Sequence, residues 1–197
     1  MELRTYMVFK FEELDKETKQ KAIDIIKEQR QQESAPWSDE VMDSLKAVFE
    51  KCNGIRLKDW SIGSYDRSYI RIEFDNGIAG ELMGKRAIAW LENNFLSNLR
   101  IGYNDLRRAE YRKYGSSYYA GQIKPCPLTG VCFDDDFING LREDIEGGMT
   151  LNDAFHGLAN TAQRMIENEE EYYTSDESIK EYIHSNDFNF LENGKIG

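Results

Sequence analysis

The stretch IRLKDWSIGSYDRSYIRIEF, residues 55–74, decides the fold class, because it carries the clearest β pattern in the chain. In its second half, isoleucine and phenylalanine alternate with charged or amphipathic residues, as in a strand that is buried on one face only. The turn-forming segment GSYDR, residues 63–67, separates the two halves. The pattern therefore predicts an antiparallel hairpin made of residues 55–62 and 68–74.

Amphipathic helices are expected on both sides of this hairpin, because apolar residues recur there at intervals of three and four. Short strands are expected at Glu2–Phe9 and Asp187–Leu191, and Ile78–Leu82 is a candidate for a third. The sequence predicts an α+β fold, in which a small antiparallel sheet is covered by amphipathic helices. The helices are expected to start at Asp15, Ser38, residue 84, Asp134, Thr150 and Ser175.

The chain has 197 residues, the length of one ordinary domain, and its 40% hydrophobic residues and 24 aromatic residues suit a folded protein. We expect a single domain over residues 1–197, with an inserted loop or helix at 100–121 and an acidic helical part at 133–197. No run approaches the roughly 20 apolar residues that cross a membrane, and the first 14 residues carry charges where a signal peptide is apolar. Together with only three cysteines, this predicts a cytoplasmic protein, in the cytoplasm of a host cell.

Charge is distributed unevenly along the chain. Residues 1–132 hold 21 Lys and Arg against 20 Asp and Glu, whereas residues 133–197 hold 4 against 16. The net charge of −11 therefore belongs to the last third. Such a surface attracts cationic partners and repels nucleic acids and anionic lipids, so no membrane partner is expected.

The residues needed for common catalytic and metal sites are few or badly spaced. His156 and His184 lie in expected helices with no nucleophile motif beside them, so we expect the protein not to be an enzyme. Cys126 and Cys132 lack the paired spacing of a zinc site, and residues 134–136, Asp-Asp-Asp, do not alternate as calcium ligands do. We interpret these aspartates as complementing the dipole of a helix start, and we expect no metal and no cofactor.

An acidic run near the C-terminus is the first candidate binding site. Tyr172, Tyr173, Phe188 and Phe190 are interleaved with its carboxylates, an arrangement that can present carboxylates in place of phosphates to a groove lined by Arg and Lys. A charged face that only keeps the protein soluble remains the alternative. The candidate contact residues are Glu167, Glu169, Glu170, Glu171, Asp176 and Glu177.

The basic, tyrosine-rich segment 100–121 is the second candidate. Cations next to aromatic rings are typical of surfaces that bind single-stranded nucleic acid, although Asp105 and Glu110 partly neutralise the charge. A solvated helix followed by a partner-binding loop fits the same residues. The residues singled out here are Arg107, Arg108, Arg112, Tyr118 and Tyr119.

Three stretches resemble small proteins of phages and other mobile elements of bacteria: TYMVFKFEELDKETKQKAI (5–23), CPLTGVCFDDDFINGLRE (126–143) and EEEYYTSDESIKEYIHSNDFNFLENGK (169–195). Genes of this kind often lie among antirestriction and anti-CRISPR functions. The resemblance therefore implies a protein that disables a host nuclease, and it implies no catalytic residues.

Charge and resemblance together predict a phage-type inhibitor that binds a bacterial nucleic-acid-targeting defence complex. The expected partner is a nuclease or ribonucleoprotein with a basic groove, such as a CRISPR Cas effector, blocked by a surface that mimics DNA. The alternative is a phage accessory protein that binds nucleic acid itself through residues 100–119.

Overall fold

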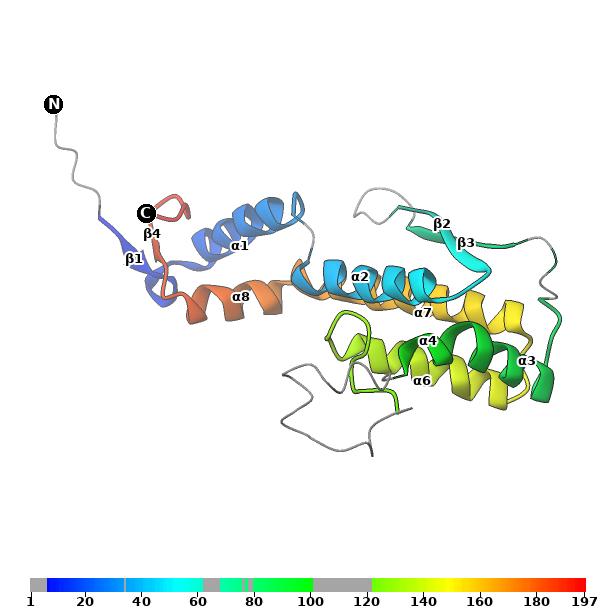
Figure 1. The fold of residues 1–197 in the computed structure, drawn as a ribbon. Helices are drawn as coiled ribbons and strands as arrows, with labels where there is room; N and C mark the ends of the chain where they lie inside the picture. Colours follow the sequence, from blue (N-terminus) through cyan, green and yellow to red (C-terminus); the bar gives the residue numbers. More distant parts are fainter. Residues whose placement is uncertain (1–6, 34, 62–67, 76, 78–79, 101–121) are drawn as a thin grey trace, which may run out of the picture. The chain divides into compact units, whose positions relative to one another are not determined.

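The computed structural model describes residues 7–33, 35–61, 68–75, 77, 80–100 and 122–197 (Figure 1). The chain divides into two compact units. The terminal unit joins Met1–Ser38 to Ile166–Gly197, so both ends of the chain belong to it, and the central unit is Asp39–Met165. The two units are described separately below.

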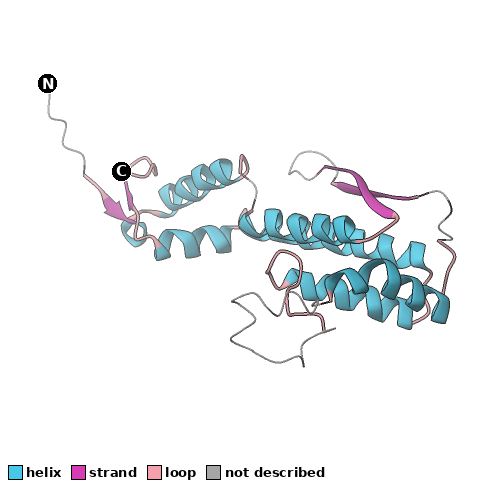
Figure 2. Ribbon diagram, viewed as in Figure 1, coloured by secondary structure: helices cyan, strands magenta, loops and turns pink. Residues whose placement is uncertain are grey.

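Helices dominate the described part, and the strands are short (Figure 2). The α+β prediction is confirmed, since helices and antiparallel strand pairs occur together. The elements, in chain order, are β1 (Phe9–Lys10), the 3₁₀ turn η1 (Phe11–Glu13), α1 (Lys16–Arg30), α2 (Pro36–Lys51), β2 (Ile55–Ser61), β3 (Tyr69–Phe74), α3 (Gly84–Leu91), the π-helical turn η2 (Glu92–Leu96), α4 (Ser97–Leu99), α6 (Phe133–Glu146), α7 (Leu151–Tyr173), α8 (Asp176–Ser185) and β4 (Asn189–Phe190).

The terminal unit is built around a small apolar core between α1, α8 and the β1–β4 pair. Asp15 caps α1 by accepting a hydrogen bond from the Thr18 N–H at 2.8 Å, as its position in the sequence predicts. Antiparallel pairing sets Phe9 opposite Phe190. The buried core residues are Phe11, Leu14, Ala22, Ile23, Ile26, Ile179, Ile183 and Phe190.

A buried arginine holds the end of α1 against the junction of α7 and α8. Arg30 is only 7% exposed, and its guanidinium lies between the rings of Tyr173 and Tyr182, at 4.2 and 4.6 Å from their centroids. It donates hydrogen bonds to the Tyr173 carbonyl and to Ser178 Oγ, at 2.6 and 3.0 Å. No ion pair of Arg30 is found among the described residues, so ring faces and neutral acceptors replace its hydration.

The hairpin of the central unit carries a β-bulge that the alternating pattern does not reveal. Leu57 faces Ile72 and Trp60 faces Ile70, and the register shifts between Leu57 and Asp59. Because directly opposed residues share a face, the bulge puts Trp60 on the apolar face, where strict alternation would put it beside the charged residues of β2. The hairpin is confirmed, but the orientation of Trp60 differs from the simple pattern.

Phe155 of α7 lies at the centre of the core of the central unit. It is fully buried, and its ring centroid lies 6.1 to 6.3 Å from those of Phe49, Phe74 and Trp90, which come from α2, β3 and α3. One helix thus joins the hairpin to two other helices. The Thr150 cap predicted for this helix is confirmed, since Thr150 Oγ1 accepts a hydrogen bond from the Asp153 N–H at 3.1 Å.

Several predicted boundaries are wrong. Within the described residues the strands form two two-stranded sheets, β1–β4 and β2–β3, and not the expected single sheet. Helix α2 begins at Pro36, whose missing N–H suits a first helical turn, and Ser38 is therefore buried inside the helix instead of capping it. Gly80–Leu82 forms no strand, while residues 78–79 of that candidate and 101–121 of the expected insertion lie outside the described residues.

Candidate acidic binding surface

The acidic run follows the last turns of α7 and the first turn of α8. The turn between them is set by Ser175, whose side chain accepts a hydrogen bond from the Ser178 N–H at 3.2 Å and caps α8 as predicted. Asp176 and Glu177 occupy the first turn of α8, where carboxylates interact favourably with the helix dipole. All of these residues belong to the terminal unit.

One exposed tyrosine is hydrogen-bonded to a carboxylate in the acidic run. Tyr172 is 47% exposed, and its hydroxyl donates a hydrogen bond to Glu181 Oε2 at 2.9 Å. This hydrogen bond and the negative charges of Glu181, Glu177 and Glu169 raise the pKa of Tyr172. We call Glu169, Tyr172, Glu177 and Glu181 the acid–tyrosine surface. It offers carboxylate oxygens beside an aromatic ring, which are the groups that hold an arginine side chain.

Two of the residues expected to contact a partner are engaged inside the terminal unit. Glu170 Oε1 accepts hydrogen bonds from the Ala35 N–H at 2.9 Å and from Ser38 Oγ at 3.1 Å, so it holds the start of α2. Asp176 lies 3.7 Å from Lys27 Nζ. These carboxylates already have donors, and a partner would have to compete for them.

The other acidic candidates lie on the outside. Glu167, Glu171 and Glu177 are exposed, and Glu169 is half-buried. No Lys or Arg nitrogen in the described ranges lies within 4 Å of a carboxylate oxygen of Glu169, Glu177 or Glu181. Their negative charge is therefore available to a cationic partner.

Sequence reasoning missed Glu181 and did not choose Tyr172 as a contact residue. A signal for Glu181 was present, because it follows Glu177 by four residues and so lies on the same side of α8. Nothing in the sequence indicated the hydrogen bond that joins Tyr172 of α7 to Glu181 of α8, since it depends on the turn at Ser175.

The charge of the chain is concentrated in the terminal unit. That unit holds 9 Lys and Arg against 17 Asp and Glu, a net charge of −8, while the central unit holds 16 against 19, a net charge of −3. The division by unit is less sharp than the division along the sequence, because the aspartates of α6 belong to the central unit.

The predicted position of Asp134 at a helix start is confirmed, and the structure adds a second role. Asp134 is fully buried, and its carboxylate accepts hydrogen bonds from the N–H groups of Leu128, Thr129 and Gly130 at 2.8 to 3.0 Å and from Thr129 Oγ1 at 2.8 Å. Gly130 has φ +94°, a left-handed conformation that suits glycine. Asp134 therefore organises the loop before α6, whereas the sequence suggested only a favourable position in the helix dipole.

Two of the side chains considered for catalysis and metal binding, His184 and Cys126, contact different carboxylates. His184 Nδ1 lies 2.9 Å from Glu12 Oε1, and Cys126 contacts Asp135. Burial raises the pKa of the Cys52 thiol to about 12, which keeps it protonated. In the described part of the chain, no group of three or more His, Cys, Asp or Glu side chains is arranged to hold a metal ion. No helix there is both long and apolar enough to span a membrane.

The second candidate site cannot be placed, because Arg107, Arg108, Arg112, Tyr118 and Tyr119 lie outside the described residues. Comparisons of the chain with family models, with curated protein sequences and with solved structures find no match. The resemblance to proteins of mobile elements stays a prediction.

Proposed function

We propose that this protein is an inhibitor that binds a cationic groove of a nucleic-acid-targeting nuclease through its acid–tyrosine surface. The observation that carries the proposal is the hydrogen bond between Tyr172 and Glu181, beside the acidic residues Glu169 and Glu177, in a unit of net charge −8. The resemblance to proteins of mobile elements directs the choice of target towards bacterial defence, with a Cas effector nuclease as the first to test.

Carboxylates can replace phosphates in such a groove because both accept paired hydrogen bonds from guanidinium groups. An arginine that pairs with Glu177 or Glu181 can also stack on the ring of Tyr172. The protein makes this kind of contact internally, where Arg30 lies between Tyr173 and Tyr182. Binding driven by exposed charges is screened by salt over about 8 to 10 Å at moderate ionic strength.

The proposal is tested by comparing two triple variants that change the net charge equally. Glu169→Lys, Glu177→Lys and Glu181→Lys reverse the acid–tyrosine surface, whereas Asp75→Lys, Glu81→Lys and Glu143→Lys reverse three exposed carboxylates of the central unit. Purified Cas effector nucleases are assayed for cleavage of labelled target DNA with increasing amounts of each protein.

The wild type and the central variant should inhibit cleavage at close to one equivalent, and the surface variant should not. Equal inhibition by both variants would remove the acid–tyrosine surface from the mechanism. If none of the proteins inhibits any nuclease, and the wild type binds nucleic acid in a gel-shift assay, the proposed function is wrong and the accessory role of residues 100–119 takes its place.

A further inference from the structure

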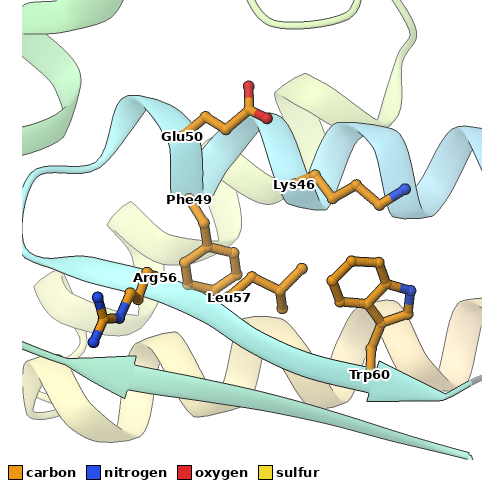
Figure 3. Close-up of a pocket in the computed structure, with 6 residues that line it drawn as sticks. All are labelled: Lys46, Phe49, Glu50, Arg56, Leu57 and Trp60. Atoms are coloured by element: carbon orange, nitrogen blue, oxygen red, sulfur yellow. The ribbon is translucent and has the colours of Figure 1, made fainter.

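A hollow of about 290 Å³ lies between α2 and β2 in the central unit (Figure 3). Phe49, Leu57 and Trp60 form its apolar part, and Lys46, Glu50 and Arg56 lie around it. Its volume is large enough for one large apolar side chain with part of its backbone. The hollow and all of its lining residues belong to one compact unit.

The β-bulge in β2 brings Trp60 into this hollow. Without the register shift between Leu57 and Asp59, Trp60 would lie on the charged face of the hairpin. On the apolar face it is opposite Ile70, yet 43% of it remains exposed. A large aromatic residue that is directed to an apolar hollow and left half uncovered is typical of a contact residue in an interface.

Two hydrogen-bond donors meet at one end of the hollow. Figure 3 shows the ammonium group of Lys46 and the indole nitrogen of Trp60 at the same end, away from Arg56, and Lys46 Nζ lies 5.3 Å from the centroid of the Trp60 ring. Trp60 Nε1 donates to no acceptor in the described part of the chain. Lys46 pairs with Asp43 at 3.0 Å, an exposed contact that a ligand carboxylate can replace.

The charges around the hollow favour a single carboxylate over a polyanion. Arg56 and Lys58 both pair with Glu73, at 3.0 and 3.9 Å, and Arg71 lies 3.8 Å from Asp59. Glu73 and Asp59 offset two of these three positive charges, so the described part of the hairpin offers little of the positive surface that a nucleic acid requires. The ligand must supply apolar surface for the hollow and one negative group for the donor end.

We propose that the hollow binds the free C-terminus of a partner protein that ends in an apolar residue. The last side chain packs against Phe49, Leu57 and Trp60, and the terminal carboxylate accepts hydrogen bonds from Lys46 Nζ and Trp60 Nε1. This site lies in the central unit and uses none of the residues of the acid–tyrosine surface, so it stands or falls independently of the proposed function.

The test uses the full chain and two hexapeptides that differ only at the end: Gly-Ser-Gly-Ser-Gly-Leu with a free carboxylate, and the same peptide as an amide. The free peptide should shift the indole N–H resonance of Trp60 in a nitrogen–proton NMR spectrum. Amidation should weaken its binding by at least about tenfold, as expected for the loss of hydrogen bonds to a charged group. The resonance is assigned with Trp60→Phe, which keeps an aromatic ring and removes the donor.

Three variants separate the donor end from general effects of charge and folding. Lys46→Met should lose most of the preference for the free carboxylate, whereas Lys85→Met, an exposed lysine of α3, should keep it. Trp60→Phe should melt at a temperature close to that of the wild type. Because it lacks the indole resonance, its weaker binding of the free peptide is measured by isothermal titration calorimetry. Equal binding of both peptides, absence of binding, or wild-type preference in Lys46→Met would each overturn the proposal.

Discussion

The terminal and central units differ in the residues that form their cores and in their net charge. The central unit packs aromatic rings of α2, β3 and α3 around Phe155 and is close to neutral in charge. The terminal unit has a core of eight buried residues and a net charge of −8, and it depends on a buried arginine held between two tyrosines. The comparison suggests that the central unit supplies stability and that the terminal unit presents charge at a cost in stability.

Replacement of Phe155 should have the largest effect on stability. Phe155→Ala removes a fully buried ring that contacts three other aromatic residues, and it should destabilise the central unit by about 3 to 5 kcal/mol. Urea unfolding followed by far-ultraviolet circular dichroism measures this loss. A loss below about 1 kcal/mol would show that the aromatic core is not the main source of stability in the central unit.

Replacement of Arg30 should have the second-largest effect, on the stability of the terminal unit. Arg30→Ala leaves the rings of Tyr173 and Tyr182 without the cation between them and should cost about 2 to 4 kcal/mol. Arg30→Lys should restore only part of this stability, because an ammonium group cannot stack as a planar guanidinium does.

Hydrogen exchange of the amides of α1 and α8 locates the effect of the Arg30 variants. Lost protection in these helices with unchanged protection in α6 is expected. Lys27→Ala is the matched control, since Lys27 is half-buried on the same helix and forms a long ion pair with Asp176. Equal effects of the two alanine variants would show that the stacked arginine has no special role.

Asp134 should make the stability of the central unit depend on pH in the acidic range. Burial raises the pKa of this carboxyl, but hydrogen bonds from the Gly130 N–H, the side chains of Thr129 and Ser44 and the Leu128 N–H outweigh burial and hold the pKa below 3.8. A lowered pKa stabilises the fold above the unfolded value near 3.8, and the stabilisation is lost as the pH falls through the lower folded value.

Asp134→Asn should therefore cost about 1 to 3 kcal/mol at neutral pH and reduce the dependence of stability on pH below about pH 4. Urea midpoints between about pH 2.5 and 7 measure both effects. Asp136→Asn, two residues further along the chain and exposed, is the control. An unchanged pH profile in Asp134→Asn would contradict the role of Asp134 in the loop.

Helix positions were predictable from the sequence, and so were the caps at Asp15, Thr150 and Ser175, because both depend on local spacing. The orientation of Trp60 was not, since a β-bulge depends on the pairing of two strands and leaves no local pattern. The separation of the strands into two sheets also depends on tertiary packing.

The candidate acidic site was predictable only in part. Composition indicated the region, but it could not separate Glu170, which holds the start of α2, from Glu177, which lies outside. Glu170 lies on α7 and Glu177 on α8, and composition does not indicate what packs against each of them. The role of Asp134 was not predictable either, because its hydrogen-bond donors come from a loop whose conformation no local pattern indicates.

The most direct test of the account is the affinity of the purified nuclease partner for the wild type and for Glu169→Lys, Glu177→Lys, Glu181→Lys, measured at salt concentrations from about 0.05 to 0.5 M. The triple variant should bind the nuclease at least about tenfold more weakly than the wild type at low salt. Rising salt should lower the affinity of the wild type much more than that of the variant. An affinity unchanged by both charge reversal and salt would show that the acid–tyrosine surface serves solubility alone.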